Sequence, residues 1–422
     1  MQSHGAAIRA CMQATLDDGR YLHWNEFRRR PAPEGLSCEQ AWSAVKVARA
    51  AKVFVPGFVD AHGVVFGYVR VDAIERAVHE WDRKQLVPEL VTYASDAGVK
   101  QGAHMVSWLQ TLMQNEALSS SVFEGAKLAT REQGMHMLAH GLAPKDKSER
   151  MVLNNMRAMQ QVVAMRERPL TREDLLALHL TLTDGALETK YKRAAGRFRH
   201  VREDIAVRDL EGQVWFQPPP AGEIEARIAQ LLAFANDEAG GAFHHPVVAA
   251  IVLHFWMAWV HPFVDGNGRL ARALFYWRML RSGYDVAEYL SISTPLLEAP
   301  NAYLRAFLHT ETDERDLTYF VLHQLGVLHE AVEAVRRDLH ARIAEVGAKR
   351  AASKKYAALN DRQVALLERL GETRGAYVTF ASHMRTHGVS MQTARTDLAG
   401  VEKGKWVRRV RVGHEMRFFG VG

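Results

Sequence analysis

The most strongly patterned part of the chain is an apolar run from Pro246 to Val260, which is too long for an ordinary strand. Its apolar residues lie on every side of a 3.6-residue period, and this predicts a helix buried all round. The pattern breaks at Asp265–Arg269, where two glycines flank an asparagine, residue types that tolerate positive φ. Apolar residues then recur at helical spacing up to Ser282, so a second helix is expected to begin at or just after Asn267.

The loop between these two helices carries groups suited to binding an anion. Backbone N–H groups of a glycine-rich turn at a helix start converge on one point and carry the positive end of the helix dipole. Arg269 and Arg272 share a face of the second helix, where guanidinium groups can fork onto phosphate oxygens. Asp265 is suited to holding Mg²⁺ beside phosphates, and His261 can take a proton near neutral pH. Together these residues predict a phosphoryl- or nucleotidyl-transfer site.

The segment His261–Arg269, HPFVDGNGR, followed by Arg272, resembles the signature of the Fic domain, whose members mostly transfer AMP from ATP to protein hydroxyl groups. The resemblance implies ATP and Mg²⁺ as cofactors and a target protein with a Ser, Thr or Tyr hydroxyl. It leaves open whether the target is this protein itself. It also implies that His261 is the catalytic base, that Asp265 is the metal ligand, and that ATP is bound by Gly266, Asn267, Gly268, Arg269, Arg272 and Tyr303. For Tyr303 a core position is the alternative, since a tyrosine at helical spacing is more often part of the core.

A second informative stretch is Leu118–Ala126, in which Ser120 and Glu124 are four residues apart and so share one face of a helix. Taken alone, it is typical of an ordinary helix whose serines form an N-cap and whose glutamate faces water. The stretch resembles the inhibitory motif of Fic proteins, in which the glutamate pairs with the second signature arginine, here Arg272. That resemblance implies that Ser120 and Glu124 restrain the ATP site.

Two short β segments flank a turn at Asp209–Gly212 and predict a hairpin beside the helical core. Its free edge could accept another chain as an added strand, and a plain surface excursion is an equal alternative. Fic domains have a flap here that holds the target segment, preceded by a pattern matched by Gly196–Arg199 and followed by prolines matched by Pro218–Pro220. The flap residues expected here are Ile205, Ala206, Val207, Val214, Trp215 and Phe216.

The two ends of the chain show different patterns. Near the N-terminus, β-branched and aromatic residues flank Asp60–Gly63 and predict a hairpin, after which Asp72 caps a helix. Near the C-terminus, helices beginning at Leu359 and Ser390 and a hairpin over residues 406–419 resemble a winged helix-turn-helix. The head of its recognition helix would carry Gln392, Thr393 and Arg395, and its basic wing would carry Lys403, Lys405, Arg408, Arg409, Arg411 and Arg417.

These basic residues suit the phosphate backbone of DNA. A module that contacts proteins and keeps only the shape of such a domain is an equal alternative. The contact expected for residues 356–422 is therefore with DNA or with protein.

The 422 residues are enough for two or three domains with sizeable cores. We expect a mainly α fold: a Fic helical core with a β-hairpin flap, plus a C-terminal winged-helix (α+β) domain. The expected divisions are an N-terminal region over residues 1–104, helical with a hairpin, a catalytic domain with its inhibitory helix over 105–340, a connector over 341–355, and the winged helix over 356–422.

Composition narrows the class of protein further. Hydrophobic residues make up 48% and charged residues 24% of the chain, as in soluble globular proteins. The net charge of +6 permits acidic partners such as nucleotides, and a mildly basic surface without such a partner is an equal alternative. Only two cysteines occur, Cys11 and Cys38, which excludes a disulfide framework. The sequence shows neither a run of eighteen apolar residues nor a leader peptide, so we expect no membrane contact and a cytoplasmic protein.

The leading interpretation is thus a protein adenylyltransferase restrained by Glu124. One alternative is a DNA-binding regulator in which the Fic core senses a nucleotide, and another is a Fic enzyme that removes AMP. Whether the protein forms a homodimer is left open.

Overall fold

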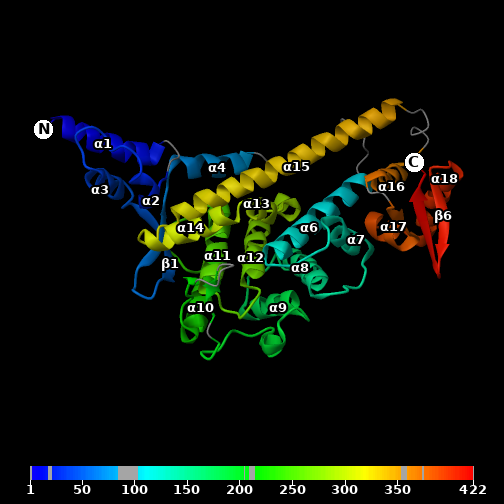
Figure 1. Cartoon of the computed structure of the whole chain (residues 1–422), viewed down its shortest axis with the longest axis horizontal. Coiled ribbons are helices and arrows are strands. Elements are labelled where there is room, and N and C mark those ends of the chain that lie inside the picture. The colour runs from blue at the N-terminus through cyan, green and yellow to red at the C-terminus, as the bar shows by residue number, and fades with distance from the viewer. Residues whose placement is uncertain are drawn as a thin grey trace.

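The computed structural model describes residues 2–17, 21–83, 103–203, 205–208, 214–352, 359–372 and 375–421. This part of the chain is mainly helical and contains three small antiparallel sheets, so the predicted fold class is confirmed. The molecule is elongated (Figure 1), and the long helix α15 (Thr318–Ala352) runs from the N-terminal half toward the C-terminal end. Every helix in the described ranges is too short or too polar to span a bilayer.

The centre of the fold is a pair of adjacent helices, α11 (Pro246–Val260) and α12 (Asn267–Arg281), which confirm the predicted boundaries. Almost every residue of both helices is buried. Pro246 in the first turn of α11 needs no N–H bond there and presets helical φ. His261 ends α11 with a φ of 49°, and Gly266 precedes α12 with a φ of 82°. The chain therefore reverses through two left-handed residues and brings the end of one core helix against the start of the other.

Further helices surround this pair and carry most of the remaining site residues. Helix α9 begins at a capping box formed by Thr171 and Asp174. The surrounding helices are α6 (Ala103–Phe123), α7 (Arg131–His140), α8 (Lys147–Ala164), α9 (Arg172–Thr183), α10 (Ile224–Ala235), α13 (Ser293–Glu298) and α14 (Pro300–Thr312).

The N-terminal part contains α1 (Gln2–Asp17), α2 (Trp24–Phe27), α3 (Cys38–Ala48), the strands β1 (Lys52–Val59) and β2 (Val65–Val69), and α4 (Asp72–Arg83). The predicted hairpin is confirmed, with Val53 opposite Tyr68. Phe58 lies fully buried and stacks on Trp256 of α11 at 4.1 Å between ring centroids. The hydrophobic core is therefore continuous from the N-terminal hairpin into the central helices, across residue 104.

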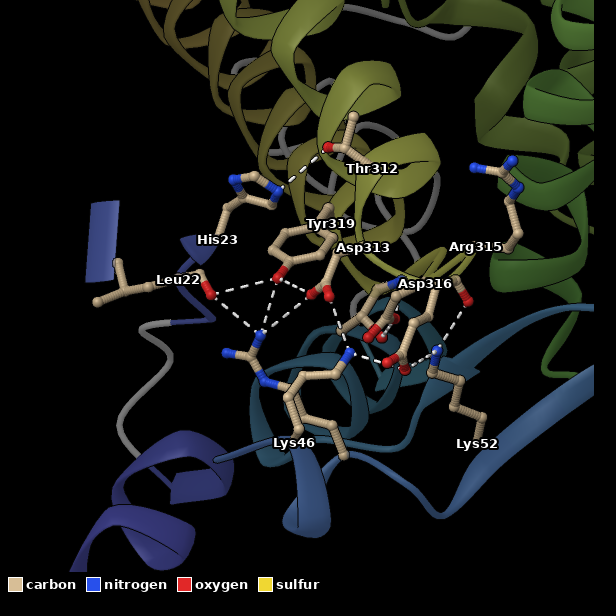
Figure 2. Close-up of polar contacts among 12 residues, drawn as sticks. Leu22, His23, Lys46, Lys52, Thr312, Asp313, Arg315, Asp316 and Tyr319 are labelled. Carbon is tan, nitrogen blue, oxygen red and sulfur yellow. Dashed lines mark hydrogen bonds and ion pairs between the residues drawn. The ribbon is translucent and has the colours of Figure 1, made fainter. Parts of the chain in front are cut away.

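A buried polar network ties α3 to the turn between α14 and α15 (Figure 2). Lys46 Nζ donates to Asp313 Oδ1 at 2.8 Å, and Tyr319 OH donates to Asp313 Oδ2 at 2.6 Å. In this turn Glu314 and Arg315 both have left-handed φ values, 55° and 56°, which side chains other than glycine rarely adopt. Such a conformation persists where the surroundings over-determine it, and the network at Asp313 does so here.

The predicted flap forms a short hairpin, in which β3 (Val207–Arg208) pairs with β4 (Val214–Phe216). Val207 lies opposite Phe216, whereas Ile205 and Ala206 precede β3 and are half-buried. The turn expected at residues 209–212 and the side chain of Trp215 lie outside the described residues.

The C-terminal unit has its own small core, which includes Leu366, Leu398 and Phe418. Its elements follow the order α16 (Asp361–Glu372), β5 (Tyr377–Val378), α17 (Phe380–His387), α18 (Met391–Lys403), β6 (Val407–Val412) and β7 (Glu415–Gly420). The strands lie in the order β5-β7-β6, and Ser390 caps α18 as predicted.

This unit packs beside α6 and α7 (Figure 1). Arg385 Nη2 of α17 donates to the carbonyl oxygen of His140 at 2.6 Å, and the His140 ring lies 3.1 Å from the Tyr377 carbonyl oxygen.

Candidate functional site

The loop between α11 and α12 is braced from inside by two buried side chains. Asn267 Oδ1 accepts the backbone N–H of Phe263 at 2.9 Å, and its Nδ2 donates to the Phe263 carbonyl oxygen at 2.8 Å. The Phe263 ring is fully buried and stacks on His179 at 3.7 Å. Because the Asn267 amide is used within the loop, the phosphate contact predicted for this residue is left to its backbone N–H.

The two glycines of the loop serve different purposes. Gly266 needs its left-handed φ of 82° to turn the chain into α12. Gly268 lies within the first helical turn and has no positive φ, although it is a residue type that tolerates one. What Gly268 provides is space, since a Cβ built there would collide with Glu124 Oε1 and lie 2.9 Å from Glu124 Cδ.

His261 faces the site in a form suited to accepting a proton. Its Nδ1 lies 3.1 Å from the Ala258 carbonyl oxygen, an acceptor, so Nδ1 carries the hydrogen and Nε2 carries a lone pair. Burial lowers the pKa of His261, which keeps the ring neutral at physiological pH. The carbonyl oxygen of His261 accepts from Arg199 Nε at 2.8 Å, and this bond fixes the end of α11.

Two buried arginines lie on the first turns of α12. Arg269 Nη1 donates to the Leu182 carbonyl oxygen at 2.8 Å, and its Nη2 lies 3.6 Å from Asp265 Oδ1. Each arginine is 1% exposed. Within the described part of the chain, Arg269 Nε and Arg272 Nη1 have no hydrogen-bond partner. Buried donors without partners are costly, so this end of α12 is well suited to an anion that would engage them.

The predicted pair Ser120 and Glu124 projects from α6 and its C-terminal end onto Arg272. Arg272 Nε donates to Ser120 Oγ at 2.9 Å, and Arg272 Nη2 donates to Glu124 Oε1 at 3.0 Å. The Glu124 carboxylate also lies against Gly268, at the positive end of the α12 dipole. A negative group of this chain therefore stands where the sequence predicts the phosphates of a nucleotide.

Asp265 could hold a metal ion only if other groups supplied further ligands. Its side chain is 39% exposed, and its Oδ1 accepts the Gly266 N–H at 2.5 Å. Across the described residues, no cluster of three or more His, Cys, Asp or Glu side chains could hold a metal ion by itself. One carboxylate beside a phosphate position fits Mg²⁺, which is commonly bound by one or two carboxylates plus substrate phosphates.

A cavity of about 220 Å³ adjoins the loop and extends along α14. His261, Gly268 and Glu124 line one part of it, and Glu311 on α14 also lines it. Tyr303 contributes its ring, while its hydroxyl lies 3.0 Å from His254 Nε2. From the flap, Val207 and Phe216 line the cavity, whereas Val214 is 45% exposed and is not among the lining residues.

The sequence did not single out His179, the side chain of Arg199 or Glu311. Neutral His179 donates from Nε2 to the Asp265 carbonyl oxygen at 3.0 Å, accepts the Gly196 N–H at Nδ1, and has a pKa lowered by burial to about 4. Arg199 Nη2 also reaches the Pro219 carbonyl oxygen at 2.5 Å. These contacts span 17 residues or more, so no local pattern could have predicted them.

Comparison with known proteins relates the segment that contains the site to one protein family. Residues 169–279 match the model of the Fic/DOC family, and these residues contain the whole loop. Two relatives named "Protein adenylyltransferase Fic", from Drosophila mojavensis and Drosophila melanogaster, are each 36% identical over 67 residues. Those residues are 16% of this chain and 13% of either relative, so the chain spans only a small part of their length.

The fold also matches a crystal structure of a Fic family protein from Desulfovibrio desulfuricans G20. The TM-score is 0.50 at 23% sequence identity, and the match covers 84% of this chain and 98% of that one. The chain therefore contains a Fic domain within a mainly helical fold.

Proposed function

We propose that this chain, through its Fic domain, is a protein adenylyltransferase that moves AMP from Mg-ATP to a hydroxyl group of a protein and is restrained by Glu124. The observation that carries the proposal is the position of the Glu124 carboxylate, which lies against Gly268 and 3.0 Å from Arg272 Nη2. A helix N-terminus flanked by two buried arginines is an anion site, and neutral His261 lies beside it. The relatives named protein adenylyltransferase support the activity at the level of the family.

In this proposal each residue has a defined task. His261 Nε2 takes the proton of the target hydroxyl, whose oxygen attacks the α-phosphorus of ATP, and the bond to pyrophosphate breaks. The N–H groups at the start of α12 and the side chains of Arg269 and Arg272 neutralise the phosphate charge and orient the chain of phosphates. Asp265 would hold Mg²⁺, which supplies further neutralisation of the phosphate oxygens. The free edge of the β3–β4 hairpin would bind the target segment as an added strand.

Glu124 restrains this reaction because its carboxylate binds the Arg272 guanidinium, which the outermost phosphate needs as its own partner. ATP held without that contact would have its α-phosphate misaligned for attack. Ser120 accepts a second hydrogen bond from the same guanidinium, so the two residues together keep Arg272 engaged with α6.

Intact-mass analysis after incubation with ATP and Mg²⁺ tests the proposal. We expect the Glu124→Gly variant to gain the mass of AMP on itself or on an added protein, and a variant that also carries His261→Ala to gain none. Glu132→Gly, which removes an exposed glutamate from the first turn of α7, is the matched control and should behave as wild type. An absence of any AMP adduct on Glu124→Gly or on proteins supplied with it would contradict the proposal, and loss of AMP from a modified protein would favour the removal reaction instead.

A second function, DNA binding, is favoured by the surface of the C-terminal unit. Arg395 on α18 and Arg408 and Arg411 on β6 are exposed, whereas Arg409 pairs with Glu402 at 3.2 Å. An exposed helix beside a basic hairpin suits the phosphate backbone and a groove of duplex DNA. Binding of duplex DNA that persists in His261→Ala would support this function independently of AMP transfer.

A further inference from the structure

Glu311 lies in the cavity away from the phosphate position. It follows Tyr303 by eight residues on α14, which is roughly 12 Å along a helix axis. Tyr303 is next to the phosphate end, since its ring lies 5.6 Å from that of Phe123, the neighbour of Glu124. Phosphates held at the start of α12 therefore direct the rest of a nucleotide along α14 toward Glu311.

The walls of this part of the cavity suit a flat, apolar ring. Phe307 and Leu308 line it from α14, Trp259 from α11 and Phe216 from the flap. Aromatic and aliphatic side chains on several sides are typical of a pocket for an aromatic base, with few polar groups to orient it. Glu311 adds a carboxyl group to this otherwise apolar part of the cavity lining.

Contacts around Glu311 hold its backbone, and its carboxyl group accepts a hydrogen bond from the Trp259 side chain at the wall of the cavity. Arg315 Nη1 donates to the carbonyl oxygen of Glu311, while Arg315 Nε donates to Asp60 Oδ2 at 2.7 Å. Figure 2 shows Arg315 pointing away from the network that fixes the turn at Asp313. The guanidinium is thus held by a backbone oxygen and by Asp60, and the turn itself is held by Lys46.

The Glu311 carboxyl group can exist in either form near neutral pH. Burial raises its pKa to about 7, although a hydrogen bond from the Trp259 side chain and the positive charge of Arg315 partly oppose this shift. The other charged or titratable groups around it are Asp60 and His62 after β1, Arg199 and Glu203 before the flap, and Glu124, His261 and Tyr303 in the same cavity.

We propose that Glu311 selects the base of the nucleotide, accepting adenine when its carboxyl group is protonated and guanine when it is ionised. The inference rests on the proposed nucleotide donor. A protonated carboxyl group accepts from the N6 amino group of adenine and donates to N1, whereas a carboxylate accepts from both N1–H and the N2 amino group of guanine. The mismatched pairings leave a buried hydrogen-bonding group without a partner.

Binding of ATP and GTP to the Glu124→Gly variant by isothermal titration calorimetry, with Mg²⁺ at pH 6 and pH 8, tests this role. The measured quantity is the ratio of the two dissociation constants, because protonation of His261 and of the phosphates affects both nucleotides alike. We expect the ratio to shift toward GTP by about tenfold at pH 8, the effect of a buried group left unpaired. Adding Glu311→Gln should hold the preference for ATP at both pH values, since an amide accepts from N6 and donates to N1. Glu311→Ala should remove the pH dependence.

Glu298→Gln, at an exposed position on α13, is the matched control and should leave the shift intact. A ratio that does not change with pH, or that changes equally in Glu311→Gln, would overturn the role of Glu311 while leaving nucleotide binding established. Failure of both nucleotides to bind would overturn the proposed function and this inference with it. Because binding is measured without transfer, a variant that binds but does not transfer AMP still decides the question.

Discussion

Glu124 Oε1 accepts a hydrogen bond from Arg272 Nη2 at 3.0 Å, and Ser120, one turn earlier, accepts another from Nε of the same guanidinium at 2.9 Å. The carbonyl oxygen of Ser120 also accepts from Nη2, at 3.1 Å, so removing Glu124 leaves Arg272 held by Ser120. The arginine would then stay beside the start of α12 and present to a ligand the Nη2 hydrogen that Glu124 accepts.

This relationship predicts that Glu124→Gly raises the rate of AMP transfer more than it raises ATP affinity. We expect a gain of roughly 10²-fold in rate, the size of effect that one donor to developing charge provides. Single-turnover rates and ATP dissociation constants of wild type and variant measure the two quantities. Arg272→Ala added to Glu124→Gly should cancel the gain, and equal rates in wild type and Glu124→Gly would show that the carboxylate does not restrain the site.

His261→Ala should abolish transfer while ATP still binds, because the substitution removes the base and leaves the N–H groups of α12 in place. The pH dependence in the Glu124→Gly background has a definite sign. Burial lowers the pKa of His261, so the neutral form persists to a more acidic pH than for an ordinary histidine. The rate should fall only as the pH drops through that lowered pKa, and a rate that instead declines with rising pH would exclude His261 as the base.

Asp265→Ala should weaken binding of ATP in the presence of Mg²⁺ and have little effect in excess EDTA. The side chain is partly exposed and pairs only loosely with Arg269, at 3.6 Å, so its loss should disturb the loop only through the hydrogen bond from the Gly266 N–H. Calorimetric titrations with and without the metal measure the difference, and an equal loss of affinity under both conditions would assign Asp265 a structural role.

Phe58→Ala should destabilise the Fic core although residue 58 lies far in sequence from the matched family segment. The Phe58 ring is fully buried against Trp256, and truncation of such a side chain typically costs about 3–5 kcal/mol. Chemical denaturation followed by tryptophan fluorescence measures the loss. Val47→Ala, at a side chain that is 65% exposed, is the control and should change stability little. An unchanged midpoint in Phe58→Ala would show that the hairpin does not stabilise α11.

Arg408→Ala combined with Arg411→Ala should weaken DNA binding and flatten its salt dependence, if the hairpin β6–β7 binds phosphates. Each lost phosphate contact should reduce the slope of log affinity against log salt by about 1. Fluorescence anisotropy with a labelled duplex at several salt concentrations measures the slope. Arg29→Ala with Arg30→Ala removes the same charge elsewhere and should leave the slope unchanged, and identical slopes in both double variants would favour a protein partner.

The sequence by itself determined the central helices and their loop. Pro246, the unbroken apolar run and the glycines predicted the ends of α11 and α12 because helix periodicity, capping and left-handed turns are local properties. The same locality made the N-terminal hairpin, the flap strands and the start of α18 predictable. The spacing of Ser120 and Glu124 predicted that they share a face, and the family resemblance supplied Arg272 as their partner.

Only the tertiary structure decided how the groups of the site are used. Asn267 was predicted to bind phosphate, but its side chain closes the loop on Phe263, and Gly268 makes room for Glu124 instead of turning the chain. Glu311 gives no local signal, because its position in the cavity depends on α14 packing against α11. Burial, the direction of a donor and the space beside a glycine are set by residues distant in sequence, so a local pattern can place a group on a helix without determining which atom it will meet.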